Sequence, residues 1–227
     1  MNDFFRFPHT PHLDWLGEGA LRDEKLLTPL EVEELLAGDV VVEEKIDGAN
    51  VGFSTTADGE LRVQNRGAYL RADHCHPQFA VLWSWLPRPT LAEALWPNLM
   101  LFGEWCYAVH SVKYDALPDW FVGFDVYDTD TGDFWSTDRR DELLNALNFA
   151  SVPRVASGQY RLDELEGMLA NSRFGREPME GIVVRREADG KTVSRAKLVR
   201  PSFVQTIDEH WSRGPFERNQ RKYDAGS

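Results

Sequence analysis

Residues Glu43 to Phe53 read EEKIDGANVGF, and the fold prediction starts from this stretch. An apolar run at residues 40–42 precedes it, and apolar positions alternate at Val51 and Phe53 inside it. Such a pattern predicts a strand, a tight turn and a second strand, with Lys45 held at the turn between two pieces of sheet. The alternative is a plain hairpin with Lys45 in water at its tip, and a four-residue K-x-D-G pattern does not decide between the two.

The residues around Lys45 bear on the reactivity of its amine. A lysine in a partly desolvated turn loses solvation of its ammonium form, so we expect the pKa of Lys45 to fall and its amine to become available as a nucleophile. Glu44 and Asp47 act in the opposite direction, because nearby carboxylates favour the charged lysine. Gly48 allows a ligand to approach the backbone closely, and Asn50 offers that ligand an amide.

The composition is that of a folded protein. A chain of 227 residues with 42% hydrophobic residues forms one large domain, or one domain with a small appendage. No apolar run is long enough to cross a membrane, and the first residues lack the basic start and apolar centre of a signal peptide. The two cysteines, Cys75 and Cys106, suggest no disulfide framework, so we expect a cytoplasmic protein without a membrane partner.

The charge distribution bears on a nucleic-acid partner. The net charge of −12 argues against one at first, because phosphate contacts need Lys and Arg. Residues 173–222, however, carry 12 Lys and Arg against 7 Asp and Glu, whereas the rest of the chain carries 13 against 30. A basic C-terminal third can therefore face a phosphate backbone, and the alternative is a solvated charged face.

Caps, turn residues and apolar patterns predict the remaining elements. In the first half they are an irregular segment at 1–27, a helix over 28–37 that Thr28 caps, a hairpin turn at 57–60 with a strand over 61–65, a helix over 76–86 that Pro87 and Pro89 end, and strands over 99–105 and 120–125. In the second half they are helices over 136–147 and 161–170, strands over 179–185 and 193–199, and a polar tail at 213–227. Acids stand at the ends of three of these strands, where they line a cleft or face water: Glu104, Asp125 and Glu180.

The tripeptide His74-Cys75-His76 invites a metal-site interpretation. Adjacent ligands cannot close a tetrahedron alone, and no second pair lies at a suitable spacing. We therefore interpret these residues as structural or incidental.

Six short motifs occur in order along the chain: Lys45-Ile46-Asp47-Gly48, Arg66 within VQNRGAYL, Phe102-Gly103-Glu104, Gly123-Phe124-Asp125, Glu180-Gly181-Ile182-Val183 and Arg195-Ala196-Lys197. Their order and spacing resemble those of the covalent nucleotidyltransferases, which include ATP-dependent RNA ligases, DNA ligases and capping enzymes. Chance explains one such motif easily, but six in order very poorly.

The resemblance is nearest to the ATP-dependent RNA ligases, in the branch of the phage nick-sealing RNA ligase and its bacterial relatives. Asn50 in KIDGAN, the phrase FGEWCYAVHSVKYDALPDWFVGFDVYD and AKLVRPSF carry it. It implies an α+β nucleotidyltransferase (adenylation) domain over residues 1–212, with two packed, mainly antiparallel sheets flanked by helices and an ATP pocket between them. Residues 213–227 would follow as a polar, basic tail.

The resemblance also implies the chemistry. Lys45 would attack the α-phosphorus of ATP to form lysyl-AMP and expel pyrophosphate. AMP would then pass to an RNA 5′-phosphate, and a 3′-hydroxyl would displace it to seal the strand during RNA repair. A DNA ligase or another end-joining enzyme shares this activation chemistry, and a nucleotide-binding subunit that docks a repair partner is a third reading.

Roles for individual residues follow from the resemblance. Asn50 and Arg66 would contact the nucleotide and then the end to be sealed, and Glu104 would hold ribose hydroxyls. Phe124 would pack on the adenine, with Phe121 as a competitor for that role. The implied nucleotide-binding residues are Glu44, Ile46, Asn50, Arg66, Glu104, Phe124, Glu180, Arg195 and Lys197. The implied catalytic residues are Lys45, Glu180 and Lys197, where Lys197 contacts the α-phosphate, and the implied ligands of Mg²⁺ or Mn²⁺ are Asp47, Glu104 and Glu180.

Two departures from the family pattern matter. The final motif often has two lysines separated by one residue, and Arg195 replaces the first of them, which changes a point charge into a planar fork. The sequence also ends soon after this motif, which leaves no room for the OB-type or helical domain that most relatives append. We therefore expect that a partner protein assists the sealing of RNA.

Overall fold

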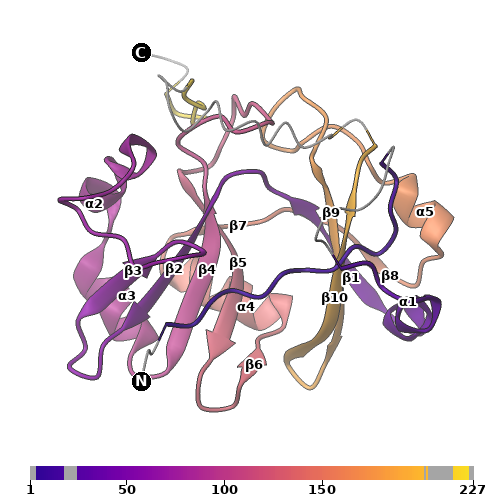
Figure 1. Cartoon of the computed structure of the whole chain (residues 1–227), viewed down its shortest axis with the longest axis horizontal. Coiled ribbons are helices and arrows are strands. Elements are labelled where there is room, and N and C mark those ends of the chain that lie inside the picture. The colour runs from indigo at the N-terminus through magenta and orange to yellow at the C-terminus, as the bar shows by residue number, and fades with distance from the viewer. Residues whose placement is uncertain (1–3, 18–24, 202, 204–216, 225–227) are drawn as a thin grey trace.

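The computed structural model describes residues 4–17, 25–201, 203 and 217–224, and shows two sheets side by side with helices around them (Figure 1). One sheet has the strand order β10-β9-β1-β8, and the other has the order β3-β2-β4-β5-β6 with β7 beside β5. Neighbouring strands in both sheets are antiparallel, except for the parallel pair of β5 and β7. The predicted α+β architecture of two mainly antiparallel sheets is confirmed.

The strands of the first sheet are β1 (Val40–Lys45), β8 (Arg154–Gly158), β9 (Gly181–Ala188) and β10 (Lys191–Val199). Those of the second are β2 (Ala49–Thr55), β3 (Leu61–Gln64), β4 (Leu99–Trp105), β5 (Phe121–Asp128), β6 (Asp133–Phe134) and β7 (Ala150–Ser151). The helices are α1 (Pro29–Leu36), the 3₁₀ helix η1 (Pro77–Phe79), α2 (Leu82–Trp85), α3 (Arg88–Leu95), α4 (Thr137–Ala146) and α5 (Leu162–Glu166).

Each sheet has its own hydrophobic core. Leu35 of α1 and Leu165 of α5 pack with buried residues of β1, β9 and β10, such as Val42 and Ile182. Residues of α2, α3 and α4 pack instead with β2, β4 and β5. Since burial of apolar area is the main stabilising contribution, the two sheets are stabilised largely independently, and the space between them is available for polar groups.

The Lys45 turn joins the two sheets. β1 pairs with β8 and β9, whereas β2 pairs with β3 and β4. The plain hairpin is therefore wrong, because the chain crosses from one sheet to the other at residues 46–48. The strand predictions on either side of this turn are confirmed.

The predicted helix boundaries are confirmed for some helices and wrong for others. Thr28 and Glu31 form the expected capping box of α1. The single helix expected over 76–86 is instead η1 followed by α2, and Pro89 lies in the first turn of α3, a helix that the sequence analysis missed. A proline lacks only an N–H that the first turn does not use, so it starts this helix as readily as it ends another. The helix expected over 161–170 ends at Glu166, before Gly167.

Both ends of the described chain run against the body. The N-terminal segment crosses from the second sheet to the first, where Lys197 N–H donates to Pro11 O at 2.8 Å (Figure 1). Residues 217–224 of the expected tail pack beside the segment after β4, with bridges from Arg218 to Ala108 and from Arg221 to Leu117. The rest of residues 213–227 lie outside the described part. Among the described residues, none of the helices is long and apolar enough to span a membrane.

Candidate active site

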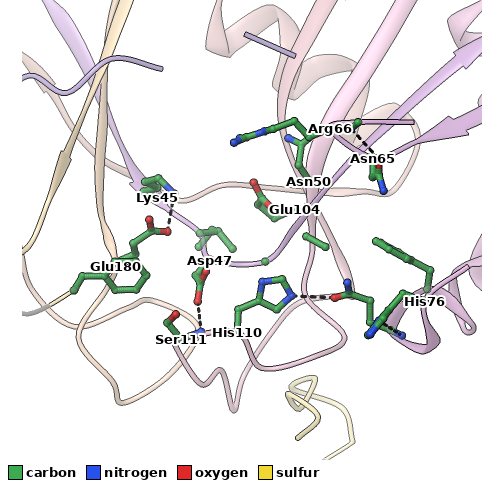
Figure 2. A pocket seen from close by; sticks show the side chains of 17 residues that line it. Lys45, Asp47, Asn50, Asn65, Arg66, His76, Glu104, His110, Ser111 and Glu180 are labelled. Carbon is green, nitrogen blue, oxygen red and sulfur yellow. Dashed lines mark hydrogen bonds and ion pairs between the residues drawn. The ribbon is translucent and has the colours of Figure 1, made fainter. Parts of the chain in front are cut away.

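Lys45 lies where the chain passes from one sheet to the other. It ends β1 and stands opposite Gly181 in the register of β1 with β9. A Cβ atom at Gly181 would lie 2.3 Å from the carbonyl oxygen of Leu198, so this approach of the strands requires glycine. Glu180 precedes Gly181, and its Oε2 accepts a hydrogen bond of 2.6 Å from Lys45 Nζ (Figure 2). Backbone register therefore brings the lysine and the acid together.

Two cavities meet at this lysine. Both are lined by Lys45, Ile46, Arg66, Glu104 and Glu180. The first, of about 440 Å³, we call the aromatic lobe, and its further lining includes Phe7, Phe124, Val152, Val183, Arg195 and Lys197. The second, of about 670 Å³, we call the amide lobe, and its further lining includes Asn50, Asn65, His76, Gln78, His110 and Ser111 (Figure 2). Both volumes lie in the usual range of small-molecule sites.

The structure brings together all the residues that the sequence analysis proposed for the site. Each lines one lobe or both: Glu44, Lys45, Ile46, Asp47, Asn50, Arg66, Glu104, Phe124, Glu180, Arg195 and Lys197. They come from both sheets and from segments up to 153 positions apart in the sequence. Their contacts differ, however, and those contacts limit what each residue can do.

The amine of Lys45 is held in its charged form. Burial alone would lower the pKa of Lys45, but the charges of Glu180, Glu104 and Asp47 together outweigh it and raise the pKa above its ordinary value. The expectation that this pKa falls is therefore wrong for the protein without a ligand. A nucleophilic amine requires that Lys45 lose its proton when a ligand binds.

Glu104 and Asn50 each present one buried polar atom to the site. They face each other on β4 and β2, and Glu104 Oε2 and Asn50 Nδ2 are buried without a hydrogen bond to any described residue. Burial raises the pKa of Glu104 to about 8, against the opposing charges of Lys45 and Arg66. An unsatisfied buried polar group costs about 1–3 kcal/mol, so these two atoms indicate a bound ligand that satisfies both.

The carboxylates of Asp47 and Glu44 accept hydrogen bonds from neighbouring loops. Asp47 Oδ2 accepts from the N–H groups of Ser111 at 2.6 Å and Val112 at 2.8 Å. The carboxylate of Glu44 accepts from Ser172 Oγ and from the N–H of Arg173. Both acids therefore fix loops around the site, and Glu44, with 1% of its surface exposed, presents little surface to a ligand.

Phe121 and Phe124, the two candidates for packing on the adenine, lie in different surroundings. Phe121 is 0% exposed and packs in the core of the second sheet, whereas Phe124 is half-buried and lines the lobe. Arg195 Nη1 donates to Asp125 Oδ2 at 2.6 Å, and its guanidinium lies over Phe134 at 4.2 Å and Phe7 at 4.8 Å. Arg195 is therefore at the lobe but is already paired.

A buried ionic network beneath the aromatic lobe was not predicted. Glu43 accepts from Arg140 Nη2 and Arg185 Nε, each at 2.7 Å, and Arg185 Nη1 donates to Asp125 Oδ1 at 2.7 Å. Both arginines also donate to the carbonyl oxygen of Phe124. The network therefore ties β1 and β9 of one sheet to β5 of the other and fixes the backbone of Phe124.

The sequence model of the RNA ligase family matches residues 38–199, from two residues before β1 to the end of β10. The chain belongs to the RNA ligase family. This match covers most of the chain and includes Lys45, Glu104, Glu180 and Lys197. No curated protein matches the chain.

Solved structures of an RNA ligase from Naegleria gruberi share the fold. A mutant with ATP and Mn has a TM-score of 0.65 at 19% identity, covering 94% of this chain and 60% of that one. An apo mutant has a TM-score of 0.65 at 18% identity, with 92% and 59% covered. The enzyme with PPi has a TM-score of 0.60 at 22% identity, with 79% and 55% covered. This RNA ligase family member therefore spans less than two thirds of the length of those chains.

The acids of the site fit a divalent cation that keeps most of its waters. Among the residues that the structure describes, no three His, Cys, Asp or Glu are arranged to enclose a metal. Asp47, Glu104 and Glu180 nevertheless all line the amide lobe, and Glu104 Oε2 has no hydrogen-bond partner within the described part of the chain. Carboxylate oxygens are the donors that Mg²⁺ and Mn²⁺ prefer, and Mg²⁺ is commonly held by one or two carboxylates with several waters.

The amide lobe contains residues to which the sequence analysis gave no role. His110 Nε2 lies 2.9 Å from Gln78 Oε1, and burial lowers the pKa of His110, which favours its neutral ring. His76 Nδ1 accepts from the N–H of Gln78, and Cys75 Sγ accepts from Trp83 Nε1. The His74-Cys75-His76 tripeptide thus places His76 in the lobe wall, although the sequence pattern around it is irregular.

Proposed function

We propose that this chain is an ATP-dependent RNA ligase whose nucleophile is Lys45. The observation that carries the proposal is the convergence of Lys45, Arg66, Glu104 and Glu180 at the junction of two ligand-sized lobes in a member of the RNA ligase family. In the proposed reaction, Lys45 forms a lysyl-AMP phosphoramidate, AMP passes to an RNA 5′-phosphate, and a 3′-hydroxyl displaces AMP as the strand is sealed.

The aromatic lobe is the proposed site of the adenosine. Phe124 offers a half-exposed ring beside apolar residues, and Lys197 and Arg66 offer positive charge for the α-phosphate. Glu104 Oε2 and Asn50 Nδ2 offer an acceptor and a donor to the ribose or the phosphate. Phosphoryl transfer depends mainly on positioning and on neutralisation of charge, and these are the functions that such residues supply.

Glu180 is the proposed acceptor of the proton that Lys45 must lose. Its Oε2 lies 2.6 Å from Lys45 Nζ, and burial raises the pKa of Glu180 against the charge of Lys45. Transfer of the proton from Nζ to Oε2 leaves a neutral amine and a neutral carboxyl group. A bound Mg²⁺ or Mn²⁺ would supply charge neutralisation for the phosphates, held by one or two of the carboxylates of Glu104, Asp47 and, while it is ionised, Glu180; the Naegleria structures with ATP and Mn support this choice.

The test is transfer of label from ATP to the protein. With ATP labelled at the α-phosphate and Mg²⁺, we expect the wild-type chain to retain label after denaturation and a Lys45→Ala variant to retain none. Equal labelling of both proteins would remove Lys45 from its role. Tight ATP binding without release of pyrophosphate would favour a nucleotide-binding subunit instead.

The substrate is tested with nicks that carry RNA or DNA on the 3′-hydroxyl side. An RNA ligase can read the 2′-hydroxyl of the terminal nucleotide, so we expect faster sealing of the RNA-ended nick. Equal rates would favour a DNA ligase or a general end-joining enzyme. Sealing by the isolated chain at the rate of AMP transfer would show that a partner protein is not required. A cytoplasmic location and a role in RNA repair also belong to this proposal.

A further inference from the structure

Residues 217–222, near the C-terminus, lie along the segment that follows β4. The backbone hydrogen bonds alternate between the two segments: Val109 N–H to Glu217 O, Asn219 N–H to Tyr107 O, Gln220 N–H to Tyr114 O, Leu117 N–H to Gln220 O and Lys222 N–H to Leu117 O, at 2.8–3.1 Å. We call residues 106–117 the β4 loop and residues 217–222 the clasp. The clasp therefore fixes this loop along most of its length.

Asn219 is the one side chain of the clasp that is buried, with 3% of its surface exposed. Its Oδ1 accepts from the N–H of Tyr114 at 2.8 Å. Its Nδ2 donates to the carbonyl oxygens of Cys106 at 2.9 Å and Ala108 at 3.1 Å. One side chain thus joins the start of the β4 loop to its far side, eight positions further along.

The β4 loop in turn holds the Lys45 turn. The hydroxyl of Tyr114 accepts from the N–H of Asp47 at 2.7 Å, and Asp47 Oδ2 accepts from the N–H groups of Ser111 and Val112. Gly48 packs against the start of the same loop, because a Cβ there would lie 3.2 Å from Cys106 Sγ. Three residues of the β4 loop, Ser111, Val112 and Tyr114, therefore form hydrogen bonds with Asp47, which lies two positions after Lys45.

We propose that Asn219 is a positioning residue for Lys45, acting through the β4 loop and Asp47. The inference rests on the proposed function. Lys45 leaves β1 into a turn that crosses between sheets, so the direction of its side chain depends on how that turn is anchored. The anchor is Asp47, and the clasp rigidifies the loop that binds it. A misplacement of about 1 Å at a reacting group can slow phosphoryl transfer about a hundredfold.

The first test compares Asn219→Ala with Gln220→Ala, whose side chain is exposed and whose backbone hydrogen bonds remain. We expect the single-turnover rate of Lys45 labelling at saturating ATP to fall about tenfold to a hundredfold in Asn219→Ala and to stay at the wild-type value in Gln220→Ala. The ATP concentration for half-maximal rate should change less than about threefold, because no residue of the β4 loop lines the aromatic lobe, the proposed site of the adenosine. A wild-type rate in Asn219→Ala, or an equal loss in both variants, would overturn the proposal.

A second variant separates positioning from general stability. Tyr114→Phe keeps the ring in the core but removes the hydroxyl that accepts from Asp47 N–H, and we expect it to slow labelling without loss of folding. If Asn219 acts through this contact, the double variant will be no slower than the slower single variant. Multiplicative losses would mean that Asn219 acts by another route and would overturn the proposal.

Amide hydrogen exchange tests the same coupling without reference to activity. In Asn219→Ala, but not in Gln220→Ala, we expect faster exchange at Asp47, Ser111 and Val112, while the β4 amides stay protected. Unchanged exchange at these three amides would overturn the proposal. If the wild-type chain takes no label from ATP, the proposed function fails, and exchange alone then decides whether Asn219 holds the Lys45 turn.

Discussion

Glu104 shows how burial sets the behaviour of a single residue in this site. Its pKa of about 8 means that the carboxyl group holds a proton at neutral pH when the site is empty. A protonated carboxyl group can donate to a ligand oxygen, whereas the ionised form can hold a cation or accept from hydroxyls. The charge of a bound ligand therefore bears directly on the protonation of Glu104.

The pH dependence of stability reports this pKa. The folded pKa of Glu104, about 8, lies above the ordinary value of 4.5, so between these two values the folded protein keeps a proton that the unfolded chain has released. This contribution to stability is full below about pH 4.5, declines as the pH rises and is lost above about pH 8. A Glu104→Gln variant lacks the titration. We expect its stability relative to wild type to increase from pH 5 to pH 9 by a few kcal/mol, measured by urea unfolding without nucleotide.

A constant difference between the two proteins across this range would show that Glu104 titrates normally. Glu60, an exposed glutamate on the turn before β3, provides the control, because Glu60→Gln makes the same chemical change at the protein surface.

At the scale of elements, the two sheets were predictable because their strands have local signals. The apolar run before Lys45 and the turn at residues 57–60 predict strands from neighbouring residues alone. The assignment of β1 and β2 to different sheets was not predictable in that way, since β1 pairs with β9, a strand that lies more than 130 positions later in the sequence. The motif order supplied the site residues, but Arg140 and Arg185 carry no motif or period that distinguishes them from solvated arginines.

The same limit applies to Arg195 and Asn219. The resemblance to the family implies a lysine at position 195, and only the structure shows that the guanidinium of Arg195 is committed to Asp125 and two aromatic rings. Asn219 lies in a polar segment without periodicity, and its importance comes from three hydrogen bonds to a loop more than 100 positions earlier. Tertiary contacts of this kind leave no trace in local pattern.

Arg140 of α4 connects the two sheets through its buried guanidinium group. Its guanidinium is 2% exposed and bonds Glu43, Asp141 and the carbonyl oxygen of Phe124. Removing one partner of a buried ion pair leaves the other charge poorly compensated, so Arg140→Ala should lower the free energy of unfolding by about 3 kcal/mol or more. Urea unfolding measures the change. Arg139→Ala is the matched control, since it removes an exposed arginine stacked on Trp135 and should cost about 1 kcal/mol or less. Equal losses would mean that Arg185 alone compensates Glu43.

At the scale of the whole molecule, both ends of the described chain contribute to the site between the sheets. The N-terminal segment binds the backbone of Lys197 through Pro11 and Leu13, and Phe7 closes the aromatic lobe. The clasp binds the loop beside the amide lobe. The clasp thus packs on the body of the protein and also carries positive charge. Removal of residues 212–227 would change this packing and this charge at once.

Charge substitutions separate these functions and test whether this surface binds RNA. Arg218 and Lys222 are exposed, whereas Arg221 is paired with Asp224 and Asp119 and should be left intact. In Arg218→Gln/Lys222→Gln we expect weaker RNA binding and a shallower dependence of log affinity on log salt, by about 0.7 for each lost contact with a single-stranded phosphate. Labelling by ATP should stay near the wild-type rate, because Asn219 and the backbone bonds of the clasp are retained.

The control for that experiment removes the same net charge far from the clasp. Arg161 precedes α5 and Lys191 begins β10. Both side chains are exposed, with surface ion pairs to Asp163 and Asp133, so Arg161→Gln/Lys191→Gln lowers the total charge equally. If RNA affinity depended only on the overall charge of −12, the two double variants would lose affinity to the same extent and with the same salt slope. A loss confined to the clasp variant, measured by RNA titration at several salt concentrations, is the result expected if Arg218 and Lys222 contact phosphates, because only direct phosphate contacts release counterions from the RNA.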